Sequence, residues 1–146
     1  MEADFLRATR QVESGDRYNA PPGRNGELGA YQFRRQVWRR YTRAPFSAAR
    51  TRLADRIAAR HYAWIRERLE AAGFSPSFWN IAAAWNSGVR AVCSGRIPRS
   101  TRDYATRVEN LASEEAGARR SLALRLPDAL AGRLRTAALV SGVASP

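Results

Sequence analysis

Apolar residues recur at helical spacing along most of this chain, in stretches separated by Gly, Pro and Asn. Residues 2–13 carry such a pattern and predict a helix that ends near Glu13. The same spacing predicts further helices over about residues 31–42, 48–72, 75–88 and 100–113. No segment shows the sustained alternation of a β-strand. The chain is therefore predicted to be mainly α-helical, with any β element minimal and confined to the Gly/Pro-rich loop of residues 15–30.

Capping residues suggest where two of these helices begin and end. Ser47 suits the N-cap of the long third helix, and Gly73 suits its C-terminal end. Ser75 and Gly88 bound the next helix in the same way, with a proline in its first turn.

The C-terminal part of the chain differs in composition from the rest. Residues 1–116 are long enough to form one domain with its own core. Residues 117–146 are rich in Arg, Ala and Leu and predict an extension with a docked helix over about residues 127–141. We expect its last residues to be frayed.

The formal net charge is +12, and every basic side chain apart from the lone histidine is Arg. Such a charge favours polyanionic partners: nucleic acid, anionic membrane surfaces or bacterial cell wall. No apolar run approaches the ~20 residues that span a membrane, and the N-terminal residues lack the pattern of a signal peptide. The chain has no known helix-turn-helix, zinc-finger or RNA-binding signature, so we expect no specific nucleic-acid partner.

The metal-binding residue types are sparse. The single cysteine, Cys93, excludes an internal disulfide and a Cys-based zinc site, and we expect it to be a small buried residue. His61 has no second His or Cys near it in the sequence and is expected at the surface or the edge of the core. These residues therefore predict no metal site.

The carboxylate of Glu13 is the first candidate for chemistry. It ends a predicted helix, so it meets the negative end of the helix dipole, and in an apolar cleft it would also lose solvation. Both effects raise a carboxyl pKa and allow the group to act as a general acid near neutral pH. From position alone, Glu13 could equally be a solvated surface residue.

Four short units give Glu13 a context. They are Glu13-Ser14, Gly29-Ala30-Tyr31-Gln32, Trp85-Asn86-Ser87-Gly88, and the segment from Pro98 to Tyr104. In this order, and over about residues 5–110, the set resembles the soluble lytic transglycosylase family of the lysozyme superfamily. The resemblance implies a lysozyme-like α-helical domain that cleaves the glycan strands of bacterial peptidoglycan, in the periplasm or cell wall, without a metal or cofactor.

The resemblance also implies roles for individual residues. Glu13 matches the sole catalytic acid/base, and Tyr104 matches a tyrosine whose hydroxyl lies beside that glutamate and helps to hold it. Gln32 and Asn86 match residues that line the sugar cleft. Tyr31 stands where the family commonly has Met.

The chain departs from the family pattern at several positions. Trp85 replaces a Tyr, and the loop is longer and richer in Pro than the common form. Ser14 follows the catalytic glutamate as in the family and is taken as a substrate-binding candidate with Tyr31. In the loop, Asn25 or another polar residue would contact the N-acetyl group of the substrate.

The implied reaction breaks the β-1,4 bond between N-acetylmuramic acid and N-acetylglucosamine and leaves 1,6-anhydro ends. Two further carboxylates, Asp16 and Glu27, lie in the loop and keep open a muramidase reaction in which water hydrolyses the same bond. Non-catalytic binding of cell wall or nucleic acid by a basic helical domain is the remaining alternative.

Aromatic residues at helical spacing are more often core than ligand-binding residues. We expect Trp38 and Trp79 in the core, and Tyr18 and Tyr31, in or beside the loop, on the cleft wall. Trp85 is expected beneath the cleft, because its neighbour Asn86 matches a cleft position.

Overall fold

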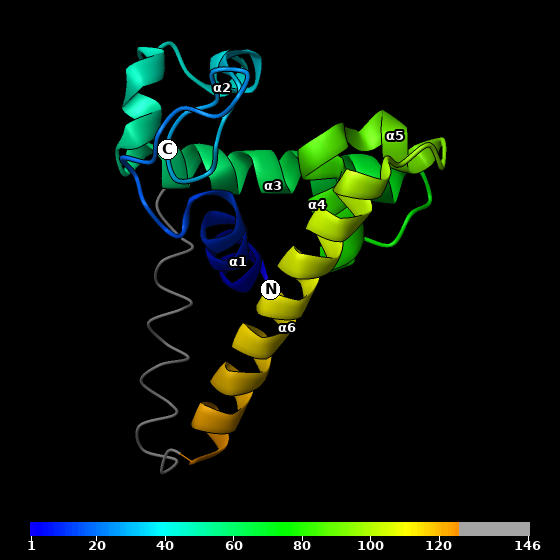
Figure 1. Cartoon of the computed structure of the whole chain (residues 1–146). Coiled ribbons are helices and arrows are strands. Elements are labelled where there is room, and N and C mark those ends of the chain that lie inside the picture. Colours follow the sequence, from blue (N-terminus) through cyan, green and yellow to red (C-terminus); the bar gives the residue numbers. More distant parts are fainter. Residues whose placement is uncertain (126–146) are drawn as a thin grey trace, which may run out of the picture.

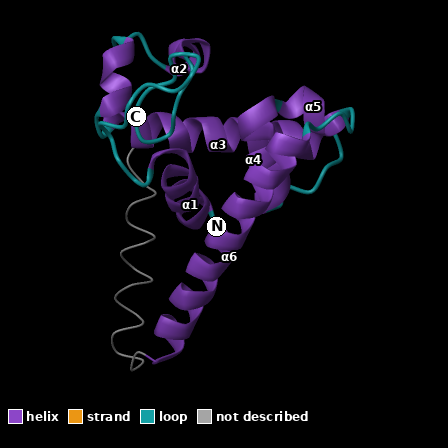
Figure 2. Ribbon diagram, in the orientation of Figure 1, coloured by secondary structure: helices purple, strands orange, loops and turns teal. Residues whose placement is uncertain are grey.

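The computed structural model describes residues 1–125, so the helix expected over residues 127–141 lies outside the described part. The helices are α1 (Glu2–Ser14), α2 (Arg35–Tyr41), the 3-10 helix η1 (Phe46–Arg50), α3 (Leu53–Ala71), α4 (Phe78–Ser87), α5 (Val89–Cys93) and α6 (Arg99–Arg125). Figure 2 shows no strand in residues 1–125. The one β feature in this part of the chain is an isolated antiparallel bridge between Leu28 and Phe33. The predicted mainly α-helical fold is confirmed.

Helix α3 runs through the middle of the structure (Figure 1). Helices α2 and η1 lie at one of its ends, and α4 and α5 lie at the other. The long helix α6 packs along both α1 and α4. As a result, the C-terminal end of α1, the following loop and the beginning of α6 come together although they are far apart in sequence.

Two hydrophobic clusters form the core. One is built on α1, α3, α4 and α6 and includes Phe5 and Ile65, and the other joins the loop, α2 and η1 to α3 around Trp38 and Phe33. Trp38 is fully buried, as predicted, whereas Trp79 is only partly buried at the edge of the first cluster. Trp85 packs against both clusters and so lies where they meet.

The predicted N-terminal boundaries of α2, α3 and α4 were wrong. Helix α2 begins at Arg35 rather than near residue 31, because the chain first turns back to form the Leu28–Phe33 bridge. The segment predicted as one helix from residue 48 is divided into η1 and α3, and Ser47 lies inside η1. The break falls at Thr51, whose extended backbone interrupts the helical conformation and whose hydroxyl oxygen accepts from the backbone N–H of Leu53.

The beginning of α4 also differs, but its end agrees with the prediction. The N-cap is Ser77, whose hydroxyl accepts a hydrogen bond from the backbone N–H of Asn80 at 3.1 Å, rather than Ser75. Gly88 is the C-cap, as expected. The short helix α5, which was not predicted, starts directly after Gly88, and Cys93 at its end is exposed rather than buried.

Helix α6 continues about three turns beyond the predicted end near residue 113. Its apolar stripe becomes weaker there, but Ala, Glu and Arg are strong helix formers on an exposed surface. No break separates residue 116 from residue 117, so residues 117–125 continue helix α6. None of the helices in residues 1–125 combines the length and the apolar character needed to cross a membrane.

Candidate active site

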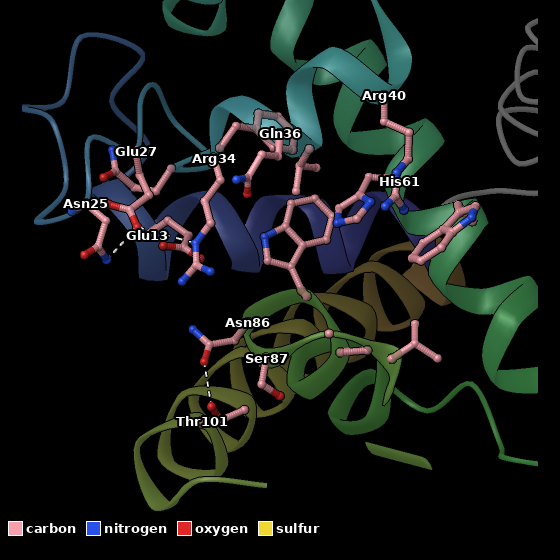
Figure 3. A pocket seen from close by; sticks show the side chains of 18 of the residues that line it. Glu13, Asn25, Glu27, Arg34, Gln36, Arg40, His61, Asn86, Ser87 and Thr101 are labelled. Atoms are coloured by element: carbon pink, nitrogen blue, oxygen red, sulfur yellow. Dashed lines mark hydrogen bonds and ion pairs between the residues drawn. The ribbon is translucent and has the colours of Figure 1, made fainter. Parts of the chain in front are cut away.

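A cavity of about 780 Å³ opens where the end of α1, the loop, α3 and α4 meet (Figure 3). Its lining includes Glu13 of α1, Asn25, Glu27 and Gln32 of the loop, Arg34, Gln36 and Arg40 at and in α2, His61 and Trp64 of α3, Trp85 and Asn86 of α4, and Thr101 of α6. It therefore collects side chains from nearly every element of the fold.

The carboxyl group of Glu13 is held between α1 and α6. The hydroxyl of Tyr104 donates a hydrogen bond of 2.8 Å to its Oε1 atom, across 91 residues of sequence. Tyr104 itself is buried. The implied contact between Tyr104 and Glu13 is present.

The environment raises the pKa of Glu13 to about 7. Burial is the largest cause, because it disfavours the charged form; the hydrogen bond from Tyr104 opposes it, and the negative charge of Glu27 adds to it. The position of Glu13 in the last turn of α1 acts in the same direction as burial, since the C-terminal end of a helix repels a negative charge. A carboxyl group with such a pKa is partly protonated at neutral pH and can donate a proton.

Ser14 ties the end of α1 to the loop. Its hydroxyl lies 2.9 Å from the carbonyl oxygen of Ala30 and accepts from the backbone N–H of Arg17 at 3.1 Å. The side chain is buried and does not line the cavity. The structure therefore places Ser14, which was predicted to contact substrate, outside the cavity lining, where its hydrogen bonds join the end of α1 to the loop.

The Gly29–Gln32 turn brings one of its two candidate residues to the cavity. Gly29 has a φ of 80°, and a Cβ atom there would collide with the backbone carbonyl of Ala49, so this position requires glycine. After the turn Tyr31 points inward: it is 2% exposed, and its hydroxyl donates to Asp55 at 3.0 Å. Tyr31 is thus a core residue and not the cleft wall that was predicted. Gln32 lines the cavity, as predicted, and its side-chain amide donates to the carbonyl of Gly29 at 2.9 Å.

Tyr18 and Asp16 belong to a separate polar network beneath the loop. The hydroxyl of Tyr18 donates to Asp55 at 2.7 Å and accepts from Arg10 at 2.8 Å. Asp16 forms an ion pair of 2.9 Å with the same arginine. Neither residue lines the cavity, so Tyr18 is not a cleft wall, and Asp16 does not lie where it could act on substrate.

Glu27 is the second carboxylate of the cavity (Figure 3). It accepts hydrogen bonds from the backbone and the side chain of Asn25 at 2.9 and 3.1 Å, and Arg34 lies 3.6 Å away. Partial burial raises the pKa of Glu27, but these hydrogen bonds and the Arg34 charge outweigh it and lower the pKa overall. Glu27 is therefore ionised at neutral pH, while Glu13 is partly protonated.

Asn86 faces the same cavity from α4. Its side-chain oxygen accepts a hydrogen bond of 2.7 Å from the hydroxyl of Thr101, a buried residue of α6 (Figure 3). This bond orients the amide so that its nitrogen lies on the side of Glu13. Asn25, Gln32 and Asn86 thus line the same cavity as Glu13.

The part of the cavity far from Glu13 was not predicted. His61 is 7% exposed and lines the wall there, with its Nδ1 atom 2.9 Å from the Tyr41 hydroxyl. Burial, and then the charge of Arg40, lower the pKa of His61 to about 4, so the ring is neutral at neutral pH. Among residues 1–125, no three His, Cys, Asp or Glu side chains gather in a way that could hold a metal ion.

Sequence reasoning missed Arg34, Thr101, Trp64 and Arg40 as cavity residues. Thr101 lies inside the Pro98–Tyr104 segment and could have been found there. The two arginines were visible only as members of Arg pairs, which solvated helices commonly carry. Their roles depend on which carboxylate or aromatic ring the fold places beside them.

Comparisons of the chain with family models, with curated proteins and with solved structures found no significant match in any of the three.

Proposed function

We propose that this protein cleaves the β-1,4 bond between N-acetylmuramic acid and N-acetylglucosamine in peptidoglycan, with Glu13 as general acid and base. The observation that carries the proposal is the carboxyl group of Glu13, which lines an open cavity, accepts a hydrogen bond from Tyr104 and has a pKa of about 7. The amide side chains of Gln32 and Asn86 on the same cavity supply donors and acceptors for sugar hydroxyl and acetamido groups.

The reaction needs one carboxyl group that acts twice. Protonated Glu13 gives its proton to the glycosidic oxygen as the bond from that oxygen to C1 of the muramic acid breaks. The acetamido oxygen of the substrate stabilises C1. The ionised Glu13 then takes the proton of the C6 hydroxyl, whose oxygen attacks C1 and forms the 1,6-anhydro end. Glu13 is protonated again, so the cycle consumes no water.

A second reaction is favoured by the pair formed by Glu13 and Glu27. Their environments move the two pKa values apart, which is the condition for one group to act as acid and the other as base or nucleophile. With Glu27 ionised in the same cavity, water could attack C1 and give hydrolysis, as in a muramidase. The hydrogen bonds from Asn25 and the ion pair with Arg34 compete for the Glu27 oxygens. We therefore rank hydrolysis second.

The deciding experiment is digestion of purified peptidoglycan by the wild type, Glu13→Gln and Glu27→Gln, with products identified by mass spectrometry. Anhydro ends from the wild type and from Glu27→Gln, but not from Glu13→Gln, would support the first reaction. Reducing ends that disappear in both variants would establish hydrolysis through the pair. If Glu13→Gln cleaves as well as the wild type, Glu13 has no catalytic role.

An inactive wild type on several wall types would leave the non-catalytic alternatives. Binding to peptidoglycan without cleavage would then indicate a wall-binding domain. Binding to nucleic acid would count only if it exceeded the weak, salt-sensitive association that a net charge of +12 produces by itself. For the proposed reaction, the site of action is the periplasm or cell wall, where peptidoglycan is found.

A further inference from the structure

The cavity holds more positive than negative charge at its rim and walls. Its charged lining residues are Glu13, Glu27, Arg24, Arg34 and Arg40. Glu27 is already paired with Arg34, and Glu13 is partly neutral. Within the described residues, Arg24 and Arg40 have no carboxylate within ion-pairing distance. The cavity thus offers cationic groups that nothing in this part of the chain neutralises.

Arg40 differs from Arg24 because packing holds its side chain in place. The guanidinium carbon lies 4.4 Å from the centre of the Trp64 ring. Trp64 in turn stacks on His61 with an interplanar angle of 12°, and His61 is fixed by the Tyr41 hydroxyl. A guanidinium that stacks on a ring uses its face, which leaves its edge available for hydrogen bonds.

The location of Arg40 determines which part of a bound substrate it could contact. Figure 3 shows Arg40 and His61 on the far side of the cavity from Glu13 and Glu27. A group bound there is not at the bond that Glu13 would protonate. It belongs to a flanking part of the same substrate.

We propose that Arg40 binds a carboxylate of the peptide that a peptidoglycan strand carries, at the end of the cavity remote from Glu13. This inference rests on the proposed function, because it assigns part of that substrate to the same cavity. The planar guanidinium matches a carboxylate through two parallel hydrogen bonds. Arg40 acts as a substrate-binding residue for the flank of the substrate.

A single carboxylate fits this end of the cavity better than a phosphate polymer does. A polymer with repeated charges needs several cations along its path. The neighbouring arginines of α2, Arg35 and Arg39, line a second hollow with Phe46. This hollow adjoins the cavity through Asn25, Arg34 and Gln36 and does not include Arg40. Among the three arginines of the fully described helix α2, Arg40 alone lines the cavity of Glu13.

The test compares two forms of one substrate. Peptidoglycan freed of phosphate polymers is divided, and in one half the peptide carboxylates are converted to amides with carbodiimide and ammonia. We measure kcat/KM of the wild type, Arg40→Gln and Arg56→Gln on both halves. Arg56 is an exposed residue of α3 outside the cavity and serves as the charge-matched control.

We expect the wild type and Arg56→Gln to prefer the unmodified form by about tenfold, the scale of one charge-assisted hydrogen bond. Arg40→Gln should cleave both forms equally well. Arg40→Lys should recover only part of the preference, since an ammonium lacks the planar fork. If Arg40→Gln keeps the full preference, the inference is overturned.

Two further measurements separate this inference from the proposed function and from folding. Binding of Glu13→Gln and of Glu13→Gln/Arg40→Gln to both insoluble forms tests the carboxylate site without any cleavage; equal loss on both forms would overturn it. Thermal unfolding of Arg40→Gln shows whether this variant has a folding defect. If it has one, the substrate preference of Arg40→Lys is used to test the inference instead. A preference that depends on Arg40 only when phosphate polymers are retained would assign the site to phosphate and overturn the carboxylate.

Discussion

Helix α1 carries a carboxyl group near each end that is at least partly shielded from solvent, and the two behave in opposite ways. Asp4, in the first turn, is 2% exposed and pairs with the N-terminal ammonium at 2.8 Å and with Arg119 of α6 at 2.9 Å. Glu13, in the last turn, also contacts α6, but its partner there is the neutral hydroxyl of Tyr104.

The partners decide the charge of each group. Burial raises the pKa of Asp4, but the ammonium and then Arg119 outweigh it and lower the pKa below its usual value. Burial also raises the pKa of Glu13, and no cation lies close enough to reverse it. The helix dipole adds to the contrast, because it favours a negative charge at the first turn and disfavours one at the last. Shielding from solvent on one helix thus leaves an anion at one end and a partly protonated carboxyl group at the other.

The largest expected effect is on glycan cleavage, which replacing Glu13 should reduce strongly and replacing Asp4 should not. Glu13→Gln should lower glycan cleavage by a factor of about 10³ or more, because the amide cannot donate the proton. Asp4→Asn should keep activity within about twofold of the wild type, because Asp4 does not line the cavity. The assay is release of soluble fragments from purified peptidoglycan. Equal losses of activity in the two variants would contradict the proposed difference in role between Glu13 and Asp4.

The next largest effect is on the free energy of unfolding, which Glu13→Gln should raise and Asp4→Asn should lower. The folded-state pKa of Glu13 lies above its unfolded value, so wild-type stability decreases as pH rises from about 4.5 to about 7. Glu13→Gln removes this loss and should raise the free energy of unfolding by about 2–3 kcal/mol at pH 8, with no gain at pH 4.

For Asp4 the sign is reversed. The pKa of Asp4 is lower in the folded state than in the unfolded state. Asp4 therefore stabilises the fold at pH values above its unfolded-state pKa, and this stabilisation is lost as pH falls through its folded-state pKa. Asp4→Asn should lower the free energy of unfolding by about 1–3 kcal/mol at neutral pH. Urea titrations of both variants at pH 4 and 8 measure these two changes in the free energy of unfolding. A destabilised Glu13→Gln at pH 8 would contradict the assigned protonation.

Tyr104→Phe tests the partner of Glu13 directly. Without the hydroxyl, the ionised form of Glu13 loses its hydrogen-bond donor, and the pKa of Glu13 should rise further. The wild-type pH profile of kcat/KM should fall as pH rises through about 7, where Glu13 loses its proton, and in the variant this fall should move to higher pH. A profile that stays in place would show that Tyr104 does not influence the acid.

The smallest effect concerns the ion pair of Asp4 with α6. The Arg119 side chain is 53% exposed, so water screens most of the attraction. Arg119→Gln should lower the free energy of unfolding by only about 0.5–1 kcal/mol and leave activity unchanged. Thermal unfolding at low and high salt measures it. A loss as large as that of Asp4→Asn would make Arg119, rather than the ammonium, the main partner.

Predictions from the sequence succeeded where a local signal decides the structure. The helical spacing identified α1 and α4, and Gly88 ended α4 as expected. They failed where a tertiary contact overrides the local pattern. Tyr31 was expected on the cleft wall, but Asp55 of α3 and the close approach of Gly29 to η1 turn it inward.

The same reason explains the errors around the cavity. Ser14 and Tyr18 are polar residues beside Glu13 in sequence, yet their hydrogen bonds hold the loop and leave the cavity to others. Trp64 and Arg40 reach the cavity from α3 and α2 because the fold brings these helices together. Periodicity and motif order contain no information on such contacts.

The sequence by itself determined the mainly helical fold, the Gly/Pro-rich loop and the placement of Glu13 at a helix end, because backbone preferences and apolar spacing act over a few residues. The tertiary structure alone decided that the pKa of Glu13 is raised to about 7. That value depends on burial, on Tyr104 and on Glu27, and these come from α6 and the loop as well as from α1. Electrostatic energies depend on distance in space, and only the folded chain sets those distances.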